Sequence, residues 1–97
     1  MQSALQTPLI EELTELTLAP GTLDIGRAAG NHIAIDDPAV SQYHARIVTY
    51  FHESFLLDLN SEHGTFLNGE RIIKHSIKEG DEIQFGAHRF VVNAANK

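Results

Sequence analysis

Glycine and proline interrupt this chain so often that few windows are long enough for a helix. Between these interruptions lie short segments in which apolar and polar residues alternate, which is the pattern of a strand with one buried face. Short strands separated by turns are typical of an antiparallel sandwich or barrel. We therefore predict an all-β domain.

Eight segments alternate clearly enough to predict strands. Residues 9–16 also fit one or two turns of an amphipathic helix, and we prefer strand there on pattern. The chain has 97 residues, enough for one small domain, which we expect at 9–93 between flexible tails at 1–8 and 94–97. The predicted strands span residues 8–13, 14–20, 21–27, 31–36, 44–52, 54–59, 81–86 and 88–93.

The two central strands are expected to form a hairpin that turns at Glu53–Ser54. The alternation places Phe51 on the same face as Ile47 in the first of these strands. In the second strand, Phe55 and Leu57 are expected to share a face.

Charge and composition exclude several classes of partner. The formal net charge is −6, from 13 acidic and 7 basic residues without a basic cluster, so we expect no nucleic-acid partner and no anionic membrane surface. No apolar run approaches the ~20 residues of a membrane helix, and the N-terminus lacks the pattern of a secretory signal. The chain has no cysteine for disulfides or a thiolate metal site, so we expect a cytoplasmic domain. We also expect it to be part of a larger multidomain protein.

Three loops carry polar residues that suit binding. In the first, Arg27 follows a strand end, where a guanidinium can clamp a phosphate or carboxylate with two parallel hydrogen bonds. Taken alone, Arg27 is better explained as a surface arginine paired with one of the 13 acids. The third loop, residues 58–70, reads DLNSEHGTFLNGE. This density of turn-forming and hydrogen-bonding residues either reverses the chain or holds a ligand.

The second loop contains Ser41 and His44, a spacing that suggests a nucleophile and its base. No GxSxG context and no oxyanion-hole segment accompanies them, so we do not expect an enzyme. Such a histidine more often hydrogen-bonds the backbone and leaves the serine hydroxyl free for a ligand. The histidines have no HxH or HxxxH spacing, so we expect no metal and no cofactor. They lie at positions 32, 44, 52, 63, 75 and 88.

Taken together, the loops and the strands between them resemble the forkhead-associated (FHA) domain. The resemblance extends from about Leu9 to Val92. Each motif is weak alone, but five in order, with fitting strand patterns between them, are specific. The motifs are Gly26-Arg27 at a strand end, Ser41 to His44, Gly64-Thr65, Asn68-Gly69, and Gly80-Asp81 followed by Ile83.

The resemblance implies a twisted antiparallel β-sandwich whose loops at one end bind a phosphothreonine of a partner protein. Arg27 matches the arginine that grips the phosphate, and Ser41 the serine whose hydroxyl donates to a phosphate oxygen. His44 matches the histidine that braces its loop from within, and Asn68 the asparagine that holds the peptide backbone beside the phosphothreonine. The positions that match tight backbone turns of the family are Gly26, Gly64 and Gly69.

The chain departs from the family pattern where the phosphate is expected. The family often reads Ser-Thr-Asn-Gly-Thr, but Glu62 and His63 stand here in place of the threonine and asparagine, and Gln42 replaces a common arginine or asparagine. A carboxylate ~6 Å from one phosphate charge repels it by about 3 kcal/mol at an effective dielectric constant of about 20. One charge-assisted hydrogen bond contributes about 1.5–3 kcal/mol, so we expect weakened phosphate affinity.

Three orientations of Glu62 remain open from the sequence. Its carboxylate points into solvent, reaches Arg27 and occupies the phosphate position, or selects a basic side chain of the partner. His63 either packs on its own loop or, when protonated, places a cation beside Glu62. The alternative to phosphothreonine recognition is a phosphate-independent interaction domain or an intramolecular regulatory domain.

Overall fold

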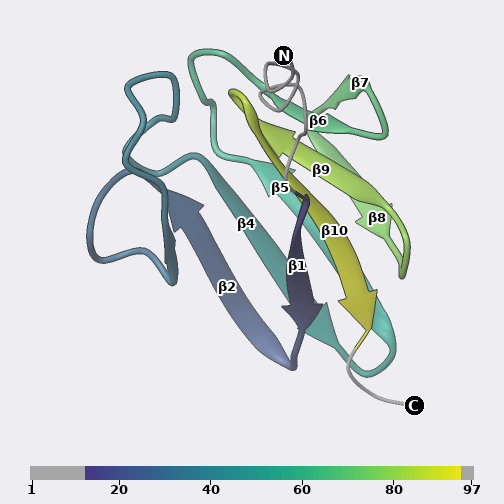
Figure 1. The fold of residues 1–97 in the computed structure, drawn as a ribbon. Helices are drawn as coiled ribbons and strands as arrows, with labels where there is room; N and C mark the ends of the chain where they lie inside the picture. Colours follow the sequence, from purple (N-terminus) through teal and green to yellow (C-terminus); the bar gives the residue numbers. More distant parts are fainter. Residues whose placement is uncertain (1–12, 95–97) are drawn as a thin grey trace, which may run out of the picture.

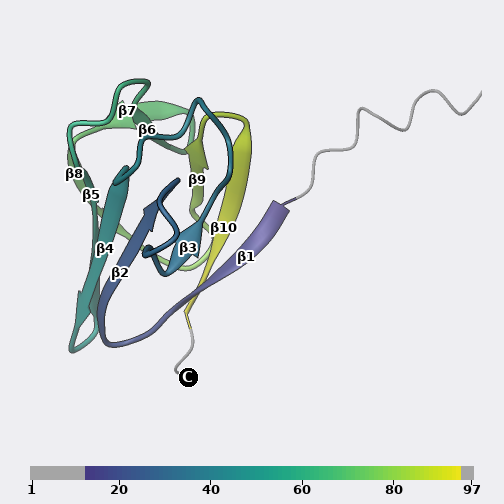
Figure 2. The ribbon, with the colours of Figure 1, turned by 90° about the vertical axis from the view of Figure 1, so that its left-hand side faces the viewer.

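The computed structural model describes residues 13–94, which form ten β-strands and no helix. The strands are β1 (Leu13–Leu18), β2 (Gly21–Gly26), β3 (Ile33–Ala34), β4 (Ala45–Tyr50), β5 (Glu53–Asp58), β6 (Thr65–Leu67), β7 (Glu70–Ile72), β8 (Lys74–Ile77), β9 (Glu82–Phe85) and β10 (His88–Ala94). They make two sheets, in the orders β1-β10-β9-β6-β7 and β3-β2-β4-β5-β8 (Figure 1; β3 is labelled in Figure 2). The sheets face each other (Figure 2), which confirms the predicted all-β sandwich.

Each sheet contains one parallel pair. β1 runs parallel to β10, and β2 runs parallel to β3, whereas the other hydrogen-bonded neighbours are antiparallel. β1 and β10 come from opposite ends of the described chain, so no tight turn forces them to be antiparallel.

The core lies between the sheets and is built from residues at alternate strand positions. The fully buried ring of Phe85 packs edge-on against Phe90, with 5.8 Å between ring centroids, and against His44, with 5.3 Å. The buried apolar residues are Leu16, Ile25, Ile35, Val40, Ala45, Ile47, Leu56, Leu67, Ile77, Ile83, Phe85, Phe90 and Val92. The strand ends that carry the polar loops are therefore held by a common core.

The β4–β5 hairpin turns two residues earlier than predicted. Tyr50 pairs with Glu53, so the turn residues are Phe51 and His52, and the predicted turn at Glu53–Ser54 was wrong. Phe51 has a left-handed backbone (φ 57°) and is 90% exposed, so it does not share a face with the buried Ile47, as the alternation predicted. A turn without glycine, proline, asparagine or aspartate leaves little sequence signal.

Phe55 and Leu57 share a face of β5, but it is the outer face. Leu56 is fully buried opposite Ile47, whereas Phe55 and Leu57 are only partly buried. The Lys74 ammonium lies 5.8 Å from the centroid of the Phe55 ring. Three consecutive apolar residues make the inward face ambiguous in the sequence.

The remaining strand predictions divide into three groups. β2, β3, β9 and β10 lie in or overlap predicted segments, and β1 is strand from Leu13 onward; residues 8–12 lie outside the described residues. β6, β7 and β8 have no counterpart among the predicted strands, because each has only three or four residues. β10 includes Ala94, and the other residues of the predicted tails lie outside the described part, so the domain bounds stay a prediction. No helix among residues 13–94 is long and apolar enough to cross a membrane.

Candidate functional site

Three polar loops meet at the end of the sandwich opposite the β4–β5 hairpin (Figure 2). Backbone N–H groups of Arg27 and Ala28 donate to the carbonyls of Ser41 (2.9 Å) and Gln42 (3.2 Å), which joins the first two loops. The Glu62 N–H donates to Ser41 Oγ (3.0 Å) and joins the third loop to the second. Motifs that are distant in sequence are thus brought together. In the structure the loops span residues 27–32, 35–44 and 59–64; the third is shorter than the predicted 58–70, because β6 begins at Thr65.

Arg27 is anchored at one nitrogen and keeps its terminal amino groups available. Its Nε donates to the Val40 carbonyl (3.0 Å), which orients the guanidinium. Among the described residues, the terminal amino groups make no hydrogen bond, and no carboxylate pairs with them. The exposed side chain therefore offers two parallel donors to a phosphate or carboxylate.

The Ser41 hydroxyl already accepts one hydrogen bond and keeps its hydrogen. Its Oγ accepts from the Glu62 N–H, and a hydroxyl can accept and donate at once. Within residues 13–94 this hydroxyl donates to no acceptor. Because the Arg27 N–H holds the Ser41 carbonyl, the free hydroxyl hydrogen lies on a loop fastened to that arginine.

The buried His44 ring ties the second loop to the third. Its Nδ1 accepts from the Ser41 N–H (3.0 Å), and its Nε2 donates to the Gly64 carbonyl (2.9 Å). These two partners select the neutral tautomer with hydrogen on Nε2. Both ring nitrogens are committed to the backbone, so neither can take a proton from the Ser41 hydroxyl. The geometry therefore gives His44 a bracing position and does not form a catalytic pair.

Asn31 and Gly26 hold the first two loops close together. The buried Asn31 donates from Nδ2 to the carbonyls of Ala28 (2.9 Å) and Gln42 (2.9 Å), a contact that no sequence motif indicated. A Cβ on Gly26 would lie 2.3 Å from the Gln42 carbonyl oxygen and 2.9 Å from Asn31 Nδ2. Only glycine fits at position 26, because the obstructing oxygen belongs to the backbone.

Asp58 organises the third loop, although the sequence motifs do not single it out. Its Oδ1 accepts from the hydroxyls of Thr65 (2.7 Å) and Ser61, and its Oδ2 accepts from the Ser61 N–H (3.1 Å). Ser61 Oγ also accepts from the Gly64 N–H (3.0 Å). Burial raises the pKa of Asp58, but hydrogen bonds from Ser61 and Thr65 outweigh it and hold this pKa below its ordinary value. An aspartate three residues before a serine is a turn signal that can identify the pair.

Gln42, Glu62 and His63 are exposed on the second and third loops. Among the described residues, their side chains make no hydrogen bond or ion pair. The Glu62 carboxylate therefore does not pair with Arg27 or occupy the phosphate position. The backbone N–H groups of Gln42 and His63 also have no acceptor in this part of the chain, so both can donate to a ligand.

Asn68 is engaged elsewhere. Its Nδ2 donates to Asp81 Oδ1 (3.1 Å), and its Oδ1 accepts from the Glu82 N–H (2.9 Å). It has a left-handed backbone (φ 51°), and Gly69 follows with φ 89°. The carboxamide thus fastens the β6–β7 turn to β9, and no hydrogen bond in the described chain joins it to Arg27. Its predicted contact with a peptide backbone stays a prediction.

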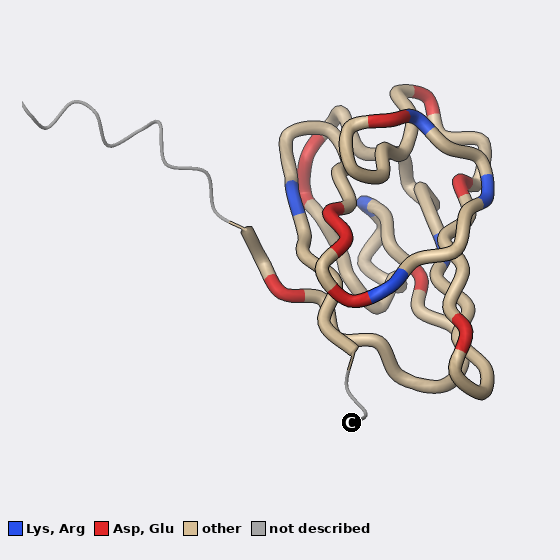
Figure 3. Tube along the Cα trace, turned by 90° about the vertical axis from the view of Figure 1, so that its right-hand side faces the viewer, with Lys and Arg blue, Asp and Glu red and all other residues tan. Residues whose placement is uncertain are grey.

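The lysines and arginines of residues 13–94 are spread singly along the trace (Figure 3). Within residues 13–94, no group of histidine and acidic side chains is arranged to hold a metal ion. Ion pairs among the described residues include Arg46–Asp24 (2.7 Å), Lys78–Asp81 (3.1 Å), Arg89–Glu82 (2.6 Å) and, when the histidine is protonated, His88–Asp37 (2.8 Å).

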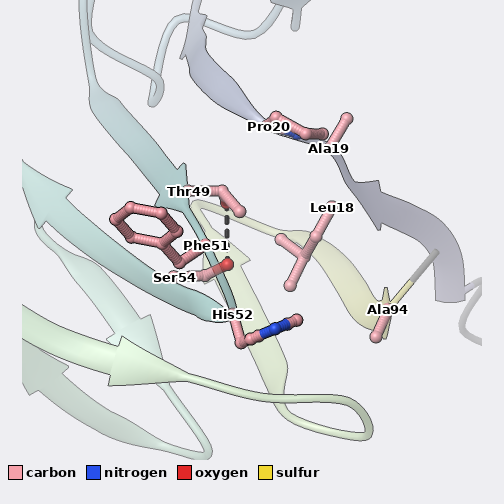
Figure 4. A pocket seen from close by; sticks show the side chains of 8 residues that line it. All are labelled: Leu18, Ala19, Pro20, Thr49, Phe51, His52, Ser54 and Ala94. Carbon is pink, nitrogen blue, oxygen red and sulfur yellow. Dashed lines mark hydrogen bonds between the residues drawn. The ribbon is translucent and has the colours of Figure 1, made fainter. Parts of the chain in front are cut away.

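A hollow at the opposite end of the sandwich lies beside the β4–β5 hairpin (Figure 4). Leu18, Pro20 and Ala94 line one side, and Thr49 and Ser54 hydrogen-bond to each other at 2.7 Å on the other. The lining contains no lysine or arginine, so this hollow does not suit a phosphate.

A family model described as the FHA domain matches residues 23–86. The chain belongs to the FHA domain family. The matched residues include all three loops, and the match confirms the family that the five motifs indicate.

FHA-containing proteins and structures give consistent matches. The chain is 36% identical over 69 residues to the ABC transporter ATP-binding/permease protein Rv1747 of Mycobacterium tuberculosis, covering 71% of this chain and 8% of that protein. The EmbR structure of M. tuberculosis, in complex with a low affinity phosphopeptide, matches with a TM-score of 0.73 at 31% identity, covering 79% of this chain and 21% of EmbR. A chain from a structural and functional analysis of phosphothreonine-dependent FHA domain interactions gives a TM-score of 0.71 at 30% identity, covering 74% of this chain and 75% of that one. The present chain of 97 residues spans less than half the length of the curated relatives it matches.

We predict that Gly26→Ala lowers the free energy of unfolding by about 1–3 kcal/mol, because its Cβ pushes the first two loops apart. Gly30→Ala is the matched control, since nothing lies within 4 Å of a Cβ at that position. Urea unfolding of both variants and the wild type measures the difference. Equal unfolding midpoints for the two variants would contradict the close contact at Gly26.

The lowered pKa of Asp58 predicts a loss of stability in acid. Its carboxylate stabilises the fold above its ordinary pKa of 3.8, and this stabilisation is lost as the pH falls through the lower folded-state value. Asp58→Asn should therefore be less stable at neutral pH and lose less stability than the wild type between about pH 4 and 2. Thermal unfolding across this range measures both effects, and Asp36→Asn controls for the loss of one exposed carboxylate. Parallel curves for Asp58→Asn and the wild type would show that the prediction is wrong.

Proposed function

We propose that this domain binds a phosphothreonine-containing partner protein through its three loops, and that it acts by recognition without catalysis. The observation that carries the proposal is that Arg27, whose terminal amino groups have no partner among the described residues, is fastened to the backbone of Val40 and Ser41, and that the Ser41 hydroxyl has a hydrogen to donate. Both residues match phosphate-binding positions of the FHA family. The phosphopeptide complex of EmbR and the phosphothreonine-dependent interactions of another FHA domain support the proposal.

Phosphothreonine suits these donors. Its phosphate carries about −1.5 to −2 charge and three acceptor oxygens. Arg27 can donate two parallel hydrogen bonds, and Ser41 can donate a third. The N–H groups of Gln42, on the second loop, and His63, on the third, have no acceptor in the described chain and add donors without further charge. In a chain with a net charge of −6, the fixed cation of Arg27 supplies the main attraction for the phosphate.

We infer that the phosphate affinity is weakened by Glu62. The N–H of this residue holds Ser41, so its carboxylate is attached to the loop that would surround the phosphate. The Glu62 side chain is exposed, and solvent screens part of the repulsion.

Asn68 keeps one lone pair on Oδ1 and one hydrogen on Nδ2 with which to hold a peptide backbone.

The proposed setting is a larger signalling protein in the cytoplasm. The chain spans only part of its curated relatives, which supports a multidomain context. The absence of cysteine fits a reducing compartment. The basic residues of the described chain are scattered, and half of them pair with carboxylates, which supports a protein partner over a nucleic acid.

Arg27→Ala should weaken binding to a degenerate phosphothreonine peptide pool at least about tenfold, because a charge-assisted hydrogen bond is worth about 1.5–3 kcal/mol. Arg46→Ala is the matched control, since Arg46 is paired with Asp24 on neighbouring strands. Fluorescence anisotropy at low and physiological salt measures both variants.

The proposal also requires that the unphosphorylated pool does not bind. Equal affinity for the two pools, or unchanged binding by Arg27→Ala, would contradict phosphothreonine recognition and favour a phosphate-independent interaction.

Glu62→Gln should bind the phosphothreonine pool roughly three- to tenfold more tightly than the wild type, because it removes a negative charge next to the phosphate. Glu53→Gln removes an exposed carboxylate at the opposite end of the sandwich and makes the same change in net charge. The gain should shrink as salt is raised. If the two variants bind equally well, the proposed weakening by Glu62 is wrong.

A further inference from the structure

Arg71 lies against the third loop, although no motif of the sequence indicated it. A Cβ built on Gly64 would lie 2.6 Å from Arg71 Nε and 2.9 Å from Arg71 Cζ. The guanidinium therefore packs on the Cα of Gly64, where the glycine leaves room for it. Gly64 has φ +93° and is held from inside by His44 and Ser61. The arginine thus rests on a part of the loop that is itself fixed.

The charge of Arg71 is not neutralised by a neighbour. Three other basic residues of the described chain, Arg46, Lys78 and Arg89, pair with carboxylates, and Lys74 lies over an aromatic ring. Arg71 is exposed on β7, and its guanidinium makes no hydrogen bond or ion pair with any described residue. Arg27 and Arg71 are the two described arginines without a carboxylate partner, and both contact the loops of the proposed site, Arg27 at Val40 and Arg71 at Gly64.

The position of Arg71 suits contact with a side chain that neighbours the phosphothreonine. The phosphate side of the third loop is marked by Glu62, whose N–H bonds to Ser41. Gly64 is two residues further along, at most about 7 Å away. In an extended peptide, side chains two positions apart are also about 7 Å apart. A guanidinium on Gly64 is therefore placed for a side chain close to the phosphothreonine.

We propose that Arg71 is a specificity residue that binds the carboxylate of an aspartate or glutamate close to the phosphothreonine of the partner. This proposal rests on the proposed function of the same loops. A guanidinium already packed on a glycine loses little freedom when it binds, and its planar fork matches a carboxylate. The chain would then recognise an acidic phosphopeptide in spite of its own negative charge.

The test uses phosphothreonine peptide pools in which one position at a time, from three before to three after the phosphothreonine, is fixed as glutamate or as glutamine. The wild type should bind the glutamate pool about three- to fivefold more tightly at one position at least, as expected for an exposed ion pair. Arg71→Gln should lose this preference and still bind the glutamine pools within about twofold of the wild type. Arg71→Lys should keep part of the preference, because it keeps the charge.

Lys74→Gln is the matched control, because it removes one exposed cation from β8, the next strand along the chain, which lies in the other sheet. This variant should leave the preference unchanged. If Arg71 only braced Gly64, Arg71→Gln would weaken all pools alike and keep the ratio of glutamate to glutamine affinities. That result, or a wild type without any preference for glutamate, overturns the role of Arg71 and leaves the proposed function intact. If the wild type binds no phosphothreonine pool at all, both proposals fail.

Discussion

The buried ring of His44 is the contact on which the loops depend. One of its nitrogens accepts from the Ser41 N–H and the other donates to the Gly64 carbonyl, so a single side chain joins two of the three loops. The ring also packs edge-on against Phe85, which couples the loops to the core between the sheets. Leaving either backbone partner unpaired in a buried setting costs about 1–3 kcal/mol. Loops held in this way need little ordering when a ligand binds.

The distribution of charged side chains also favours ligand binding at the loops. Most basic side chains of the described residues are paired with carboxylates or placed over a ring, whereas Arg27 and Arg71 lie unpaired at the loops. A domain with a net charge of −6 repels an anionic peptide at long range, so its attraction for one must come from these local cations. The Glu62 carboxylate opposes this attraction. We propose that the balance between this one carboxylate and the two arginines determines which phosphopeptides bind.

The order of the motifs was enough to predict the family. It was also enough to predict that Arg27, Ser41 and His44 lie in loops at the same end of the sandwich. Alternation located most of the strands, because a residue such as Ile83 in β9 is buried between polar neighbours. The turn at Phe51 was missed because a left-handed phenylalanine has no sequence signature. The hydrogen bonds from Asn31 to the Gln42 carbonyl and from the Thr65 hydroxyl to Asp58 were also missed, since they join groups that come within reach only after folding.

The most direct test of phosphate recognition by these loops is a titration of the ¹⁵N-labelled domain with a phosphothreonine peptide and its unphosphorylated counterpart, followed by amide NMR shifts. We predict that the phosphopeptide shifts the amides of Gln42 and His63, whose N–H groups are unpartnered in the described chain, and leaves the amide of His52 in the opposite hairpin unchanged. Equal shifts with both peptides, or shifts confined to the β4–β5 hairpin, would contradict a phosphate site at the three loops.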